Sequence, residues 1–153
     1  DDGAVPNATW DASDCSLNCT IANRSLVLQH VTCGSLLSAA KATVGLVSRA
    51  AYFEVVVISP PHAAQSFPPE MRIGVGTEQA GPTLGSRGTV GFSSSSHALL
   101  EDFAATNSAI RFGFTDAVGL LVDKEDGVVC LVINRMIVTT LSIPEGLRNE
   151  PLY

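Results

Sequence analysis

The stretch from Ala51 to Gly91 constrains the fold of this chain more than any other part. It contains short apolar segments with the two-residue alternation of β-strands, separated by one Pro-rich and one Gly-rich connection. In the first segment, residues 51–58, the side chains that point to either side of an extended chain are nearly all apolar. A strand of this kind is typical of a sheet with both faces covered. We therefore expect it to lie centrally, inside a sandwich.

Further strand candidates occur at spacings of roughly 8–12 residues, with Gly and Pro between them. They are Ser25–Val31, Met71–Val75, Val90–Phe92, Ile110–Phe114, Val118–Val122, Val128–Asn134 and Met136–Leu141. The charged segment Asp123–Gly127 ends in Gly and predicts a hairpin turn between two of them. Ile143–Gly146 predicts another turn. This pattern predicts an all-β protein, a two-layer antiparallel β-sandwich.

Two segments allow alternative interpretations. Residues 35–42 contain helix formers and predict one helical turn, but a strand over 43–47 fits the alternation equally well. Residues 97–104 have the three-to-four spacing of a short helix, whereas the family resemblance described below implies a strand and a turn there. The sequence leaves both choices open.

The domain organisation follows from the length and from the polar N-terminal region. A chain of 153 residues predicts one domain. Residues 1–22 contain few apolar side chains and predict an N-terminal tail, ordered in part around Trp10. Residues 23–153 then form the sandwich domain, which we expect to be a monomer.

The charge distribution argues against nucleic acids and membranes as partners. The net charge is −6, and the basic residues are scattered singly rather than in a stripe. Phosphate backbones and anionic lipid surfaces both require clustered basic side chains. No window of the sequence reaches the ~18 consecutive apolar residues of a membrane-spanning helix.

Cysteines and glycosylation sequons leave two cellular locations open. Three sequons begin at Asn7, Asn18 and Asn23, and the four cysteines are Cys15, Cys19, Cys33 and Cys130. Disulfides among them would indicate a secreted protein. Cys130, however, lies within an apolar run, where a free thiol behaves as a small core residue. Because sequons also arise by chance in Ser-rich and Thr-rich segments, we predict an intracellular protein.

No motif in the sequence predicts catalysis, a cofactor or a metal. The Gly74-Val75-Gly76 segment lacks the third Gly of a dinucleotide loop, since Gln79 stands at that position. Asp123, Glu125 and Asp126 fit a solvated turn better than a calcium loop, which needs more oxygen ligands. A G-x-S-x-G nucleophile elbow is absent from the sequence. We therefore predict a protein that is not an enzyme, with no cofactor and no metal.

Several segments together resemble a known family. They are Tyr52–Val55, Arg72–Gly76 (RIGVG), Leu84-Gly85, Asp116–Asp123, Val128–Asn134 and Pro151–Tyr153. In this order they resemble the SPRY domain, a concanavalin-like β-sandwich, from about Ser25 to Tyr153. Two residues depart from its pattern: Thr115 and Arg135 stand where Gly is usual. The second departure predicts a different turn after Asn134.

The resemblance implies a protein-interaction module that binds a short peptide through loops at one end of the sandwich. The residues that it places at this end are Arg72, Glu78, Gln79, Leu84, Ser86, Arg87, Ser94 and His97. Arg72 matches an arginine that faces an acidic partner segment in SPRY domains of histone-methyltransferase complexes, where a bidentate contact is expected. It fits a solvated charge on a strand equally well. Ser86 and Ser94 replace the aromatic residue and the second arginine of that pocket.

A lectin-like β-sandwich, secreted or at a cell surface, is the alternative function. The sequons and the Cys15–Cys33 cluster favour it. Sugar sites use an aromatic face with polar neighbours, and this chain has one Trp and two Tyr. The small number of such side chains favours the peptide-binding hypothesis.

Overall fold

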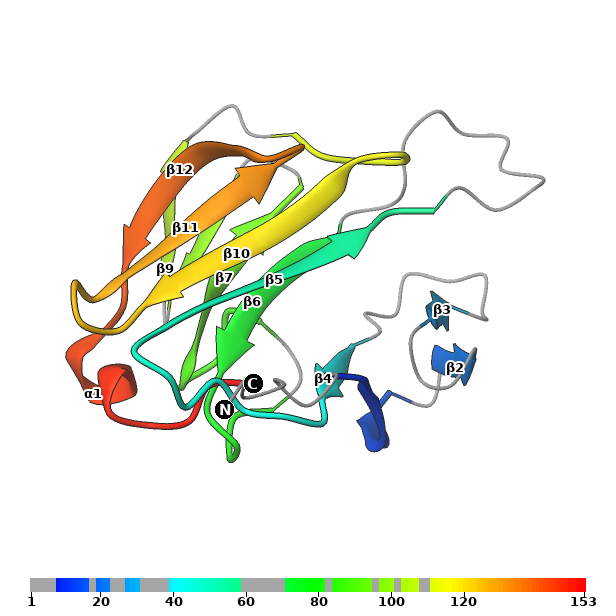
Figure 1. Ribbon diagram of the computed structural model, residues 1–153, viewed down its shortest axis with the longest axis horizontal. Helices are drawn as coiled ribbons and strands as arrows, with labels where there is room; N and C mark the ends of the chain where they lie inside the picture. Colours follow the sequence, from blue (N-terminus) through cyan, green and yellow to red (C-terminus); the bar gives the residue numbers. More distant parts are fainter. Residues whose placement is uncertain are drawn as a thin grey trace, which may run out of the picture.

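A computed structural model describes residues 8–16, 19–22, 27–30, 39–58, 71–81, 84–94, 97–100, 103–107 and 111–153. Within these residues the chain forms antiparallel β-sheets and one short helix (Figure 1). The prediction of an all-β, antiparallel fold is confirmed.

The first four-stranded sheet has the order β12-β11-β10-β5. Its strands are β5 (Ala50–Val56), β10 (Ala117–Asp123), β11 (Val128–Ile133) and β12 (Met136–Ser142). The predicted hairpin between β10 and β11 is confirmed, with Asp123 opposite Val128. The Asp123 carboxylate accepts the backbone N–H groups of Glu125 and Asp126, so this acidic turn closes on itself.

The second four-stranded sheet has the order β6-β7-β8-β9. Its strands are β6 (Arg72–Gly76), β7 (Thr89–Ser93), β8 (His97–Leu100) and β9 (Phe103–Asn107). Of the two interpretations for residues 97–104, the strand is therefore confirmed and the helix is wrong, while the turn at 101–102 lies outside the described residues. Pairing with both neighbours in the sheet overrides the helical spacing of the apolar residues.

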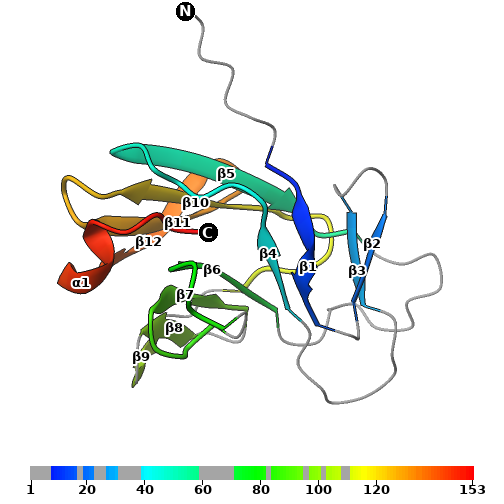
Figure 2. The same cartoon turned by 90° about the horizontal axis from the view of Figure 1, so that it is seen from below.

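Both sheets contribute to one hydrophobic cluster, and Figure 2 shows them one above the other. Phe92 and Val90 enter it from β7, and Leu120 and Leu131 enter it from β10 and β11; all four are fully buried. Burying a side chain of this size stabilises a protein by roughly 1.5–3 kcal/mol. Residues of both sheets are therefore buried in the same cluster. Leu152, also fully buried, closes it by bridging to Leu46 and Thr77.

The N-terminal part forms two small sheets beside the larger ones (Figure 1). β1 (Trp10–Cys15) pairs with β4 (Ala40–Ala42), and β2 (Cys19–Ala22) pairs with β3 (Val27–His30). β1 and β2 thus lie within the segment predicted as a tail. For residues 35–47, the strand lies at 40–42, whereas the described residues 43–47 contain only the bridge at Leu46. Residues 35–38 lie outside the described residues.

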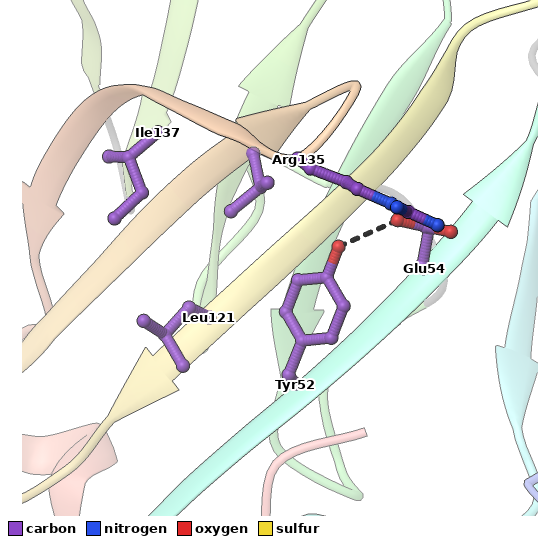
Figure 3. A pocket seen from close by; sticks show the side chains of 6 residues that line it. Tyr52, Glu54, Leu121, Arg135 and Ile137 are labelled. Atoms are coloured by element: carbon purple, nitrogen blue, oxygen red, sulfur yellow. Dashed lines mark hydrogen bonds between the residues drawn. The ribbon is translucent and has the colours of Figure 1, made fainter.

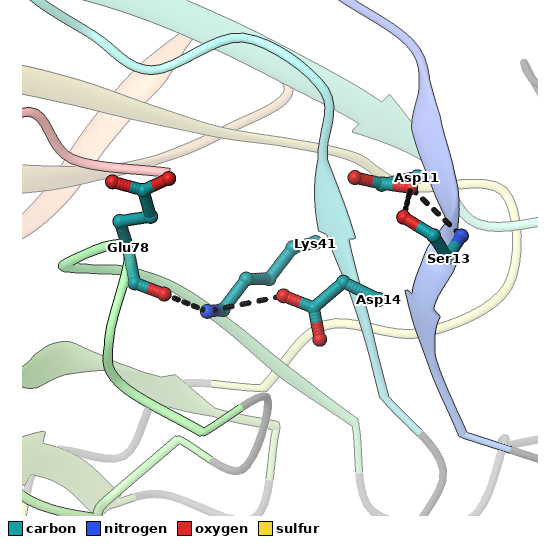
Figure 4. Close-up of polar contacts among 5 residues, drawn as sticks. All are labelled: Asp11, Ser13, Asp14, Lys41 and Glu78. Carbon is teal, nitrogen blue, oxygen red and sulfur yellow. Dashed lines mark hydrogen bonds and ion pairs between the residues drawn. The ribbon is translucent and has the colours of Figure 1, made fainter.

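Lys41 connects β4 with β1 and with the loop that follows β6 (Figure 4). Its Nζ forms an ion pair with Asp14 at 3.2 Å and donates to the backbone carbonyl of Glu78 at 2.9 Å. Nearby on β1, the hydroxyl and backbone N–H of Ser13 both donate to the Asp11 carboxylate, which lowers the pKa of Asp11. These contacts connect residues that lie before position 42 with the loop that follows β6.

Two local predictions differ from the structure. Residues 111–113 form no strand, although Phe112 is buried in the core. The turn predicted at Ile143–Gly146 contains the start of the helix α1 (Glu145–Arg148). Pro144 precedes this helix, where its fixed φ is compatible with a helix start, and Leu147 anchors it by burial.

Cys130 forms no disulfide with the other cysteines that the structure describes. This side chain is buried on β11 as a free thiol, as predicted, and the Thr140 hydroxyl donates to its sulfur at 3.4 Å. Cys15 is also a free thiol and is partly exposed. Cys33 lies outside the described residues.

The prediction that β5 is a central strand with both faces covered is wrong. β5 is the last strand in the order of its sheet, and its side chains alternate between exposed and half-buried. Phe53 and Val55 pack against the core, whereas Val56 remains 59% exposed. The sequence could not distinguish a strand covered on both faces from a strand with one exposed face. Apolar residues can occupy the outward positions of a strand whether or not another element covers them.

Candidate binding surfaces

The sequence-predicted site residues lie around the β6–β7 hairpin, in two groups. Arg72, Leu84 and Ser94 form the first. The Arg72 Nη1 donates to the Leu84 carbonyl at 3.0 Å, and Arg72 pairs with Ser93, the residue before Ser94. The Ser94 hydroxyl accepts the backbone N–H of Met71 at 2.9 Å. His97 begins β8 close to this group, since its neighbour Ala98 pairs with Phe92.

The second group lies at the other end of the hairpin. Glu78 and Gln79 follow the last residue of β6, and Ser86 and Arg87 precede β7. Glu78, Gln79 and Arg87 are exposed. β6 separates the two groups by roughly 13 Å, at ~3.3 Å per residue. The structure therefore does not bring all eight predicted residues together at one end.

The loop between β6 and β7 covers part of the outward face of this hairpin and leaves Arg72 exposed. Leu84 lies over Gly74: a Cβ atom at that glycine would be 2.6 Å from the leucine Cδ2 atom. The Thr89 side chain is 1% exposed, and its hydroxyl donates to the Ser86 carbonyl and accepts the Gly85 N–H. The loop between β6 and β7 thus folds back onto its own strands, and Leu84 is used in packing.

The outward face of the β12-β11-β10-β5 sheet carries a shallow hollow of about 490 Å³ (Figure 3). Its lining residues come from all four strands and one turn: Tyr52, Glu54, Leu121, Val132, Arg135 and Ile137. Leu121, Val132 and Ile137 provide an apolar floor, and Tyr52, Glu54 and Arg135 provide polar groups. Ile137 is 60% exposed, and a bulge between Leu131 and Val132 places the exposed Val138 beside it.

Tyr52 and Glu54 form a fixed polar pair on β5. The Tyr52 hydroxyl donates to the Glu54 Oε2 at 2.8 Å, and this bond to a carboxylate raises the pKa of Tyr52. The phenol ring lies over Gly119 on β10, where a Cβ atom would be 2.5 Å from the hydroxyl oxygen. A side chain at position 119 would therefore displace the ring. Tyr52 itself remains 48% exposed.

Arg135 reaches the same pair from the turn between β11 and β12. Both turn residues have positive φ, 50° at Asn134 and 69° at Arg135, as in the two-residue hairpin turns that usually contain Gly. The prediction that the turn differs because Gly is replaced is wrong. The Asn134 side chain fixes this geometry, since it donates to Asp116 at 2.9 Å and accepts the Ala117 N–H at 3.0 Å. Tertiary contacts impose a backbone that arginine disfavours.

The Arg135 guanidinium lies beside the Glu54 carboxylate and the Tyr52 hydroxyl (Figure 3). Within the described residues, it makes no hydrogen bond and no ion pair within 4.0 Å. Its positive charge opposes the rise in the pKa of Tyr52. The hollow therefore presents hydrogen-bond donors, a carboxylate acceptor and an apolar floor next to one another.

Sequence reasoning missed every residue of this hollow as a binding residue. Tyr52, Glu54 and Leu121 were placed correctly in strands, but both faces of the strand with Tyr52 and Glu54 were expected to be covered. The residues could have been grouped only through strand pairing, which places paired residues on the same side of the sheet. Tyr52 pairs with Leu121, and Glu54 pairs with Gly119. Only a known strand order reveals that these pairs face solvent.

Among the described residues, no three His, Cys, Asp or Glu side chains cluster as metal ligands. The described part of the chain also contains no helix long and apolar enough to cross a bilayer. Comparisons with protein-family models and with curated proteins find no match to this chain.

Proposed function

We propose that this chain is a non-catalytic interaction module, a two-layer SPRY-type sandwich that binds a short segment of a partner protein. The observation that carries the proposal is the exposed hollow on the outer face of the β12-β11-β10-β5 sheet. Shallow apolar surfaces with a polar rim are characteristic of protein interaction sites. The function is the one implied by the sequence resemblance, but we place its main contact surface on the sheet rather than on the loops.

Exposure and apolar character coincide at this surface. Val56, Ile137 and Tyr52 are each about half exposed or more, on two strands that border the hollow. A partner that covered these side chains would remove apolar area from water, at roughly 25 cal/mol per Å². The rigid hydrogen-bonded ladders beneath them hold the side chains in place before binding, which lowers the entropic cost of association.

Two backbone angles support the SPRY resemblance. The positions where that family usually has Gly are Thr115 and Arg135, and their φ angles are 74° and 69°. Positive φ is the conformation in which Gly is favoured, and it is unusual for a β-branched residue such as Thr. The backbone at both departures is thus the one that the family pattern implies.

The proposal is tested with a display library of random linear peptides as the probe. Peptides selected on the wild-type chain are titrated against Ile137→Glu, which places a charge on the apolar floor. We expect the affinity to fall by roughly tenfold or more, because a buried unpaired charge is costly. The matched control is Arg72→Ala. It removes the arginine of the binding site that the sequence resemblance predicts on the loops, and it leaves the hollow intact.

The pattern of binding across the two variants identifies the surface that binds the peptides. Loss of binding only in Ile137→Glu supports the hollow. Loss only in Arg72→Ala moves the site to the loop end, and a library without binders contradicts the interaction function. Thermal melts must show that both variants are folded; the Tm of Ile137→Glu should match the wild type, whereas Arg72→Ala also loses its hydrogen bond to the Leu84 carbonyl and should melt slightly lower.

Carbohydrate binding is the second candidate, and one observation favours it. The half-exposed ring of Tyr52 has a carboxylate and a guanidinium as neighbours, which is the combination that sugar sites use. A panel of immobilised glycans tests this candidate. Binding that disappears in Tyr52→Ala and is absent for the peptide library would replace the peptide proposal.

A further inference from the structure

We propose that Arg135 anchors the segment bound in the hollow by donating to one of its main-chain carbonyl oxygens, while an apolar side chain of that segment lies on the floor. This inference rests on the proposed peptide-binding function and names the chemical group that is recognised. It assigns a role to a residue that the SPRY resemblance counts only as a departure from its pattern.

The position of Arg135 supports this role. It lies at the rim of the hollow, with Leu121, Val132 and Ile137 on the floor beside it. Its guanidinium has no hydrogen-bond or ion-pair partner among the described residues. A planar fork with five N–H donors is therefore available to a ligand, directly next to an apolar surface.

The charge of the site indicates an amide rather than a carboxylate. Glu54 and Arg135 line the same hollow, so Glu54 would repel a ligand carboxylate while Arg135 attracts it. In an extended segment one residue presents its N–H and its C=O to the same side, the C=O as an acceptor for Arg135 and the N–H as a donor for Glu54. Only one oxygen of Glu54, Oε2, accepts the Tyr52 hydroxyl. The main chain of an extended segment thus satisfies the cation and the anion together.

The backbone of Arg135 gives an independent reason. A left-handed conformation is unfavourable for every residue except Gly, and Asn and Asp tolerate it best. Glycine at position 135 would fit the turn with less strain. Strained backbone positions are often associated with binding sites, and here the strained residue is the one that faces the hollow.

The test compares Arg135→Gly with the wild type in two measurements. Thermal melting should show an unchanged or higher Tm for Arg135→Gly, because strain is relieved. Titration with the library-selected peptides should show an affinity lower by roughly tenfold or more, since hydrogen bonds to a charged group are the stronger kind. Arg49→Ala is the matched control: it removes an equal charge from a residue at the opposite end of β5, so binding should be unchanged.

The outcomes separate this inference from the proposed function. Peptides that require Ile137 but bind Arg135→Gly as tightly as the wild type overturn the inference and leave the interaction function in place. Peptides that do not require Ile137 contradict the proposed surface itself. Recognition of an amide also predicts that acidic side chains are not enriched in the selected peptides. A uniform enrichment of Asp and Glu, with binding that weakens strongly with salt, overturns the amide assignment.

Discussion

The β6–β7 hairpin and the β12-β11-β10-β5 sheet differ on the faces that point away from the core. On the β6–β7 hairpin the outward positions of β6 are Arg72, Gly74 and Gly76. Leu84 covers Gly74 and Ala80 lies near Gly76, whereas Arg72 is exposed. On the other sheet the outward positions include Tyr52, Leu121 and Ile137, which the described residues leave partly open. Small residues allow a backbone to pack closely, whereas large ones leave a side-chain surface for a partner.

Because of this difference, the alternation of side chains along a strand affects both stability and binding. Inward side chains of both sheets join one core and determine stability. Outward side chains determine stability only where a loop covers them, as at Thr89, which is 1% exposed. Elsewhere they are available for binding. Substitutions on the two sides should therefore separate stability from function.

The largest effect is expected from a matched pair on neighbouring strands. Leu131→Ala on β11 removes a fully buried side chain and should destabilise the protein by about 2–5 kcal/mol. Ile137→Ala on β12 removes one that is 60% exposed and should change the free energy of unfolding by roughly 0.5 kcal/mol or less. Urea denaturation measures both. Equal losses would mean that a further element covers Ile137.

A smaller loss of stability is expected where the backbones of β6 and β7 approach each other most closely, at Gly91. A Cβ atom at Gly91 would be 2.5 Å from the Ile73 carbonyl oxygen and 2.8 Å from the Gly74 Cα atom. Because these are backbone atoms, Gly91→Ala should cost about 1–3 kcal/mol. Gly81→Ala is the control, since no atom lies within 4 Å of its added Cβ. Unchanged thermal melting of Gly91→Ala would contradict the close approach of the two strands.

The smallest expected effect is on the pKa of Tyr52, which forms a hydrogen bond with Glu54 in the hollow. Because the bond to Glu54 raises the pKa of Tyr52, Glu54→Gln should return that pKa toward 10.0. Absorbance titration of the phenol measures the change, and Tyr52→Phe identifies its signal beside that of Tyr153. A titration of Tyr52 that is identical in wild type and Glu54→Gln would rule out the bond in solution.

The same bond fixes the sign of a pH dependence. The folded state holds the Tyr52 proton to higher pH than the unfolded chain does, so the unfolded chain binds fewer protons above about pH 10. The stabilisation is fully present below the unfolded pKa and is lost as the pH rises through the folded pKa. Glu54→Gln should lose less stability than the wild type in this alkaline range.

Particular residues show how far sequence reasoning reached. The hairpin from Val118 to Asn134 was predictable because two apolar runs flank a charged turn that ends in Gly. The turn at Asn134–Arg135 was not, because arginine in a left-handed conformation contradicts local preference. Its geometry depends on Asp116 and Ala117, residues that are distant in sequence.

The sequence by itself determined that the chain is all-β and antiparallel, because strand alternation and turn residues are local properties. Only the tertiary structure decided which apolar face is buried. Tyr52 and Phe53 are adjacent aromatic residues on one strand, yet Phe53 packs on the core and Tyr52 faces the hollow. The order of strands and the path of the loops decide that difference, and both depend on contacts between residues far apart in the chain.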